Sequence, residues 1–269
     1  MGGCRRRSSL TWALYRIAIE PLPAPATTPQ YWLLWPVVVF RGVGQIMFQR
    51  NALAGALFTA GVAVGGGSAI WMATAGVLGS LTGAVVARVL RFDRTEWSDG
   101  VHGFNPALVG MATFFFFKPS AHAAWLFVGS AVVATLLAAV CRRYVPVPVY
   151  TTPFVVCTWA LHAVGIRLGL DPVAWHAPVA PGLHIGEAVI EGLSEVMLTG
   201  GNPYTGLIFL AGIAVSNWRH AVLAALGAAV GAALAVYRVW QILLARRRIV
   251  DQNGDNWTTD RRYHHGPDA

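Results

Sequence analysis

The sequence predicts an all-α membrane protein, and three observations support this class. Of the 269 residues, 55% are hydrophobic and only 12% are charged, whereas a soluble domain carries about 25% charged residues. The mean hydropathy is +0.53, and 29 residues are glycine, which lets membrane helices approach closely. The apolar residues gather in long runs, as membrane spans require. This composition excludes a disordered chain and argues against a soluble enzyme.

The charged residues are distributed as they are beside membrane spans. The net charge is +8, and the arginines form short clusters next to apolar runs, at 5–7, 91 and 94, 142–143 and 246–248. Basic loop residues of this kind set the orientation of membrane helices. A nucleic-acid-binding face would be continuous, so we expect no nucleic-acid partner. The three cysteines fit no metal or disulfide spacing, and we expect neither a metal site nor a cofactor.

Residues 1–30 form a segment of their own. Three arginines precede an apolar stretch over 10–19, a pattern similar to a signal peptide. No clear small-residue cleavage site follows, because Glu20, Pro21 and a proline-rich loop come next. We therefore interpret 1–30 as a cytoplasmic or interfacial segment.

Residues 31–165 form the predicted first membrane repeat. Its apolar segments, each expected to be helical, cover 31–48, 53–64, 69–90, 104–117, 121–140 and 149–164. The segment 104–117 has only about 14 residues, too few to cross a bilayer, and it follows Gly100 and Gly103. Short apolar segments interrupted by glycine mark re-entrant half-helices that line a solute path.

The second half is shorter and ends in a polar tail. A polar, proline-rich connecting loop covers 166–184, and apolar segments then cover 185–198, 207–215 and 221–245. We assign 185–245 to a second, truncated membrane repeat and 246–269 to a polar tail. Within this tail, 251–269 has no helical apolar stripe, which predicts disorder.

One stretch of the sequence occurs twice. Residues 41–55 correspond to 191–206, with matching Gly, Gln or Glu, Met, Asn and Gly positions and one residue inserted in the second copy. The offset of about 150 residues exceeds the period of solenoid repeats. Duplicated halves with a solute site between them are typical of transporters.

Three motifs resemble the urea transporter family. They are GVGQIMFQ at 42–49, GVHGFNPALVG at 100–110, and EVML at 195–198 followed by NPYTG at 202–206. The resemblance extends over roughly 35–245. It implies two inverted halves, each with five membrane helices and one pore-lining half-helix. It further implies a homotrimer with one pore per protomer, and passive permeation of urea across a lipid bilayer.

The resemblance also implies which residues line the pore. They comprise polar groups, aromatic walls of a flat slot, and apolar residues of a constriction. The polar groups are Gln45, Thr151 and Glu195; the slot walls are Phe48 and Phe104; the apolar residues are Ile46, Leu108, Val196 and Leu198.

The residues themselves leave other interpretations open. Gln45 could make a helix-packing hydrogen bond, and the phenylalanines could face lipid or the protein core. Thr152 competes with Thr151 for the central position. A carboxylate within the membrane, as at Glu195, is costly and functional by default. His102 could confer pH sensitivity, but a loop histidine satisfied by its neighbours is the preferred interpretation.

The chain departs from the family pattern at three places. Ala52 stands where the family usually has proline, so one half-helix stop is missing. Leu198 replaces the aromatic residue commonly found opposite Phe48, which leaves one phenyl wall in that slot. After 245 the second half-helix, a second pore threonine and further spans do not follow, and the change to a polar tail suggests a truncated or frameshifted gene.

We predict a passive, selective urea channel of a bacterial inner membrane, and not an enzyme. The sequence shows no glycine-rich phosphate loop with lysine and no nucleophile–base pair. A truncated or frameshifted membrane protein that does not conduct is the main alternative. A channel for another small amide or for ammonia is a further one, because lining groups separate close analogues weakly.

Overall fold

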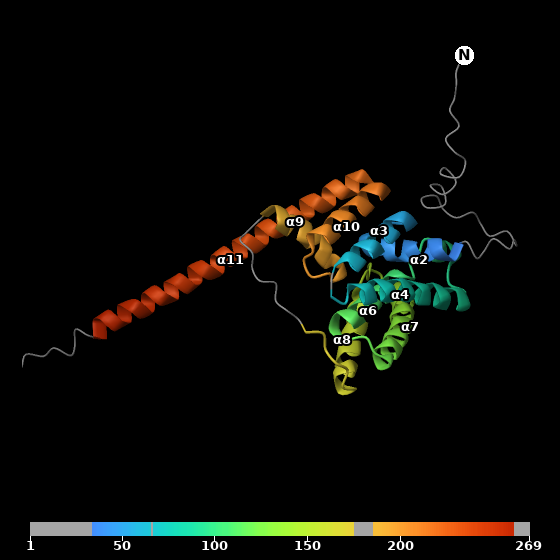
Figure 1. Ribbon diagram of the computed structural model, residues 1–269, viewed down its shortest axis with the longest axis horizontal. Helices are drawn as coiled ribbons and strands as arrows, with labels where there is room; N and C mark the ends of the chain where they lie inside the picture. Colours follow the sequence, from blue (N-terminus) through green and yellow to red (C-terminus); the bar gives the residue numbers. More distant parts are fainter. Residues whose placement is uncertain (1–33, 66, 175–184, 261–269) are drawn as a thin grey trace, which may run out of the picture.

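The described residues form an all-helical protein, as the composition predicts. The computed structural model describes residues 34–65, 67–174 and 185–260. Figure 1 shows a bundle from which the C-terminal helix projects. In chain order the elements are α2 (Leu34–Gly44), η2 (Gln45–Met47), α3 (Ala52–Val64), α4 (Ala69–Val89), α5 (Arg94–Ser98), α6 (Phe104–Phe116), α7 (Ala121–Tyr144), α8 (Thr152–Arg167), α9 (Ile185–Ser194), η3 (Glu195–Met197), α10 (Pro203–Ser216) and α11 (Trp218–Asp260).

Each predicted apolar segment overlaps one of these helices where the structure describes it, but α10 and α11 are longer than the predicted segments 207–215 and 221–245. The short helix α5 was not predicted, because it is polar; Asp93 begins it by accepting a hydrogen bond from the Glu96 backbone N–H at 2.9 Å. The predicted N-terminal segment 1–30 and much of the connecting loop 166–184 lie outside the described residues.

Helix α6 is the most enclosed element of the bundle. Ten of its thirteen residues are buried, and it packs against α4, α7 and α8. On α4, Gly76, Gly79 and Gly83 face α6, and a Cβ atom at Gly79 would overlap the backbone of Pro106. From the other side, a Cβ atom at Gly110 would overlap the Ala75 carbonyl. The two helices therefore meet backbone to backbone, as small residues allow in membrane proteins.

The chain makes the same sharp turn after η2 and after η3. Phe48 (φ 57°) and Leu198 (φ 63°) adopt the left-handed conformation, and each backbone N–H donates to the carbonyl three residues earlier. Asn51 and Asn202 then cap α3 and α10, each accepting from two backbone N–H groups. Asn51 thus starts α3 without a following proline, whereas α10 has proline in its first turn.

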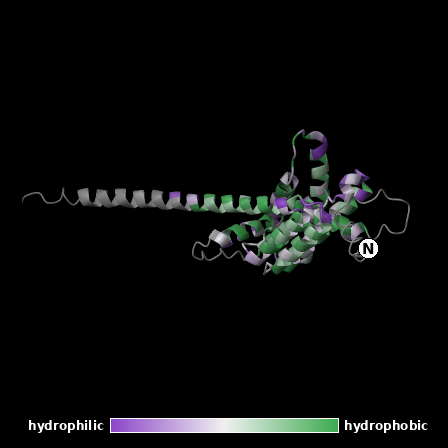
Figure 2. Cartoon of the chain, turned by 90° about the horizontal axis from the view of Figure 1, so that it is seen from above, coloured by the Kyte–Doolittle hydropathy of each residue, from purple (hydrophilic) through white to green (hydrophobic). Residues whose placement is uncertain are grey.

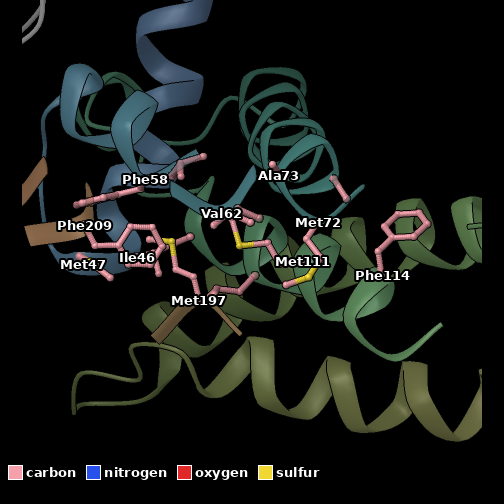
Figure 3. Packing of buried hydrophobic residues seen from close by; sticks show 14 of the residues in the cluster. Ile46, Met47, Phe58, Val62, Met72, Ala73, Met111, Phe114, Met197 and Phe209 are labelled. Carbon is pink, nitrogen blue, oxygen red and sulfur yellow. The ribbon is translucent and has the colours of Figure 1, made fainter. Parts of the chain in front are cut away.

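Helices α3 and α10 contact each other reciprocally. Phe58 and Phe209 meet edge to face, with ring centroids 5.6 Å apart. A Cβ atom at Gly61 would lie 2.7 Å from the Phe209 ring, and one at Gly212 would lie 2.6 Å from the Phe58 ring. Figure 3 shows both phenylalanines in one apolar cluster with Ile46, Met47, Met111 and Met197. Each helix thus carries a glycine that makes room for the phenylalanine ring of the other.

Helix α11 is the most exposed element. Its first part, Trp218–Arg238, is apolar and long enough to span a membrane, yet only 6% of it is buried. One side of α11 packs against α9 and α10, and Figure 2 shows the apolar character of its first part in green. The helix continues to Asp260, so the prediction that residues 251–260 are disordered is wrong. Helix elongation is favourable once a helix exists, and no proline interrupts the chain before Pro267.

The helices identify a membrane protein. Within the described residues, three helices are long and apolar enough to cross a bilayer: Ala69–Val89, Ala121–Tyr144 and Trp218–Arg238. Several shorter apolar helices accompany them, including Phe104–Phe116. A length of thirteen residues agrees with the predicted half-helix, because a span needs about 20 residues.

Replacing Gly79 by valine tests the contact between α4 and α6. The added side chain cannot fit against the Pro106 backbone, so we expect a loss of about 1–3 kcal/mol in the free energy of unfolding. Thermal unfolding in detergent measures this loss. Gly129→Val is the matched control, because nothing lies within 4 Å of a Cβ atom at Gly129. An equal loss in both variants would contradict the argument.

Candidate permeation site

The first group of predicted pore residues lies at the turn between α2 and α3. Gln45 is partly buried, and its Nε2 donates to the Asp99 carbonyl at 3.0 Å. Phe48 is 67% exposed. Its ring meets Tyr150 edge to face, with centroids 5.6 Å apart. The packing hydrogen bond considered for Gln45 is therefore present, and the aromatic neighbour of Phe48 is Tyr150.

The predicted apolar residues divide into an enclosed set and an exposed one. Ile46 (6% exposed) and Leu108 (3% exposed) belong to the main core, and Phe104 and Leu198 pack against it as partly buried residues. Val196 is 49% exposed. The structure therefore brings four of the five apolar or aromatic residues named here into one cluster.

The hydroxyl-bearing candidates sit at the start of α8. Thr151 is the N-cap residue of α8 and is partly buried, but its side chain makes no capping hydrogen bond. Thr152 is exposed. Thr151 fits the predicted central pore position better than Thr152 does. Thr151 is less exposed, and its hydroxyl is not used to cap α8.

Asn105 attaches this threonine segment to α6. Its Oδ1 accepts from the Phe154 backbone N–H at 3.1 Å, and its Nδ2 donates to the Tyr150 carbonyl at 3.3 Å. The side chain is almost fully buried, at 2% exposure. Asn105 belongs to a motif that the sequence singled out, but its contact with a segment 45 residues away carries no local sequence signal.

Glu195 occupies the position of η3 that Gln45 occupies in η2. It is exposed, and Glu191 lies four residues before it in the chain. A Cβ atom at Gly201 would lie 3.4 Å from Glu195 Oε1. Glu195 therefore occupies the same position of η3 that Gln45 occupies in η2, but Glu195 is exposed whereas Gln45 is partly buried.

A charged cluster holds the turn that precedes α6. His102 is 5% exposed; Arg142 lies 2.8 Å from its Nδ1, and Glu96 Oε2 lies 3.4 Å from its Nε2. Burial and then the Arg142 charge lower the pKa of His102 to about 4, although Asp93 opposes them. The ring is therefore neutral at pH 7, with its proton on Nε2, because a guanidinium can only donate to Nδ1.

No group of three or more His, Cys, Asp or Glu residues in the described ranges could hold a metal ion. The arrangement around α6 instead offers the Gln45 amide, the Thr151 hydroxyl, which makes no capping hydrogen bond, and aromatic rings next to apolar side chains. Such groups can bind a small neutral solute by hydrogen bonds and flat contacts, which is how pores without charged rings select their solutes.

A comparison with protein families identifies the family of this chain. The family model described as urea transporter matches residues 37–241. The chain belongs to the urea transporter family. This is a family of membrane transporters and not of enzymes, which agrees with the prediction from the sequence.

Curated relatives support the same assignment. Urea transporter 1 of Rattus norvegicus and that of Mus musculus are each 29% identical over 210 residues, which cover 72% of this chain and 54% of the relative. Urea transporter 1 of Capra hircus is 26% identical over 211 residues. The chain thus spans about half the length of the curated relatives it matches.

The buried histidine makes stability depend on pH. In the unfolded chain His102 gains a proton near its ordinary pKa of 6.5, whereas the folded protein resists protonation until about pH 4. The contribution of neutral, buried His102 to the free energy of unfolding is therefore fully present above pH 6.5. It is lost as the pH falls toward 4. At about 1.4 kcal/mol per pKa unit, the loss amounts to about 3 kcal/mol.

Thermal unfolding of wild type and His102→Gln between pH 4 and 7.5 measures this effect. We expect the variant to lose less stability than the wild type as the pH falls, because glutamine does not titrate. Parallel pH curves for the two proteins would show that His102 does not carry the effect.

Proposed function

We propose that this chain provides a passive, selective path for urea across a membrane. The observation that carries the proposal is the enclosed short helix α6. Its thirteen residues extend about 20 Å at 1.5 Å per residue, whereas the hydrocarbon core is about 30 Å thick. A buried helix that stops short of crossing, with Phe104 and Leu108 in its first two turns, supports a half-helix beside a solute path.

The chemistry of urea fits the groups around α6. Urea is flat and neutral, with N–H donors on both sides and one carbonyl acceptor. A selective path therefore needs hydrogen-bond acceptors between flat apolar walls. Gln45 and Thr151 offer side-chain oxygens, and the last turn of any helix leaves unpaired carbonyls. Phe48 and Phe104 would supply the flat walls, and Ile46 and Leu108 the narrow apolar section.

The wider architecture follows from the same proposal. The reciprocal contact of α3 with α10 and the matching turns at Phe48 and Leu198 support two inverted halves. Glu195 and Val196 would then face the path from the second half. The proposal also includes a homotrimer with one pore per protomer, in a bacterial inner membrane, as the resemblance to the family and the arginine-rich loops imply.

A non-conducting membrane protein is the second candidate, and one observation favours it. Val196 is 49% exposed, whereas Ile46, at the corresponding position of the first half, is 6% exposed. The first half is covered by α6, and in the described part of the chain nothing covers the second half in the same way. A channel for another small amide or for ammonia shares all the groups named above and differs only in solute.

Urea efflux from proteoliposomes, followed by stopped-flow light scattering, tests the proposed function. We expect flux well above that of empty vesicles and a strong preference for urea over glycerol. Phe48→Ala should lower the urea flux up to about tenfold, because a lost aromatic contact is worth up to about 1.5 kcal/mol. Trp125→Ala is the matched control, since Trp125 is a similarly exposed aromatic (77%) on α7.

Three outcomes would contradict the proposal. Folded wild-type protein that conducts no faster than empty vesicles would favour the non-conducting candidate. Equal effects of the Phe48 and Trp125 substitutions would show that Phe48 does not line the path. Faster flux of ammonia or formamide than of urea would show that urea is not the preferred solute and would favour the alternative channel.

A further inference from the structure

Three contacts from the α2–η2 turn hold the segment Ser98–Asp99. Arg41 Nη1 donates to the Ser98 carbonyl at 3.1 Å, and Gln45 Nε2 donates to the Asp99 carbonyl at 3.0 Å. Arg50 Nη1 pairs with Asp99 Oδ2 at 2.7 Å. The Asp99 side chain is 13% exposed, whereas that of Arg50 is 64% exposed. The segment is therefore fixed at its backbone and at its carboxylate from the same turn.

The contact with the Asp99 carbonyl determines which way the Gln45 amide faces. A backbone carbonyl can only accept a hydrogen bond, so the atom of Gln45 that meets it must be the NH₂ group. The opposite orientation would place two acceptors 3.0 Å apart. The amide oxygen Oε1 is not used in this contact; among the described residues it has no hydrogen-bond partner, and it is not fully buried.

The corresponding residue of the second half is a glutamate, and its surroundings differ. Glu195 is exposed, and in the described part of the chain its carboxylate accepts or donates no hydrogen bond. A glutamate needs no carbonyl acceptor opposite it, because an ionised carboxylate has no proton to donate. Glutamine is required only where a carbonyl faces the side chain, and this is the case at position 45.

We propose that Asp99 is a positioning residue for the solute path, which holds the Gln45 amide so that Oε1 faces the solute as an acceptor. The inference rests on the proposed function, because Gln45 acts on solute only if it lines the path. It assigns to the first half a fixed acceptor that recognises N–H donors. Arg50 contributes by holding the Asp99 carboxylate, and so the segment that carries the carbonyl.

Gln45→Glu tests this orientation with almost no change of shape. At pH 7.5 the ionised glutamate cannot donate to the Asp99 carbonyl, so the acceptors repel each other. We expect urea flux to fall about tenfold and the unfolding temperature to drop. When the pH is lowered to about 5 and the carboxyl gains a proton, its O–H can donate to the Asp99 carbonyl. Flux and unfolding temperature should then return toward the wild-type values at that pH.

The surrounding charges are the same in both proteins, so wild type measured over the same pH range is the control. The charged groups near position 45 are Arg41 and Arg50 on its own turn and Asp99 opposite. Helix α6, which packs against η2, has no ionisable side chain. A Gln45→Glu protein that conducts and melts like wild type at pH 7.5, or that shows no recovery at low pH, would overturn the inference.

Substitution of Arg50 gives a second test that leaves the core intact, because Arg50 is exposed. Arg50→Gln removes the ion pair with Asp99 and should lower the preference for urea over glycerol about threefold, because an exposed ion pair contributes only a small free energy. Arg50→Lys keeps the charge and should restore the preference. Arg143→Gln is the matched control, since in the described part of the chain Arg143 forms no ion pair. Equal effects of the substitutions at Arg50 and Arg143, or no effect of either, would also overturn the inference.

These experiments separate the inference from the proposed function. Wild-type protein without urea flux would refute the proposed function and, with it, the role of Oε1 toward solute. The pH-dependent unfolding of Gln45→Glu would still report whether the Asp99 carbonyl orients the amide. Urea flux in wild type together with unchanged behaviour of Gln45→Glu would refute the positioning role alone.

Discussion

The close contact between α4 and α6 is the constraint on which the rest of the structure depends. Glycines on both helices allow the two backbones to touch, and this contact places a helix of thirteen residues in the interior of the bundle. Because α6 is fixed there, Asn105 can reach the segment before α8, and Leu108 can join the core beside Ile46. The candidate site is therefore a consequence of helix packing as much as of the residues that line it.

The sequence was sufficient to predict most of the helices, because their signal is local. Apolar runs, asparagine caps and glycines determine α3, α4, α6 and α10, and the shortness of α6 follows from the length of its apolar run. The tail was misjudged because its polarity was taken as evidence against a helix, whereas residues 251–260 continue a helix that begins at Trp218. The short helix α5 was missed because capping, and not an apolar stripe, begins it.

The site could be predicted only in part, and the missing part consists of long-range contacts. The resemblance indicated Gln45, Phe48, Phe104 and Leu108 as members of the site, but no local pattern links Phe48 to Tyr150 or Gln45 to Asp99. These pairs are about 50 to 100 residues apart in the chain. They depend on how the turn before α3 packs against two other loops, which only the folded arrangement shows.

At the left-handed turns of Phe48 and Leu198, the backbone conformation favours glycine, but the chain has a large side chain at each position. Glycine adopts positive φ at no steric cost, and the chain uses glycine for this purpose at Gly67, Gly100, Gly169, Gly200 and Gly201. At 48 and 198 it instead places large apolar residues in a conformation that is uncommon for them. The fold is thus locally less stable at these two turns than it could be, and the bulky side chain is the part of each turn that folding alone does not explain.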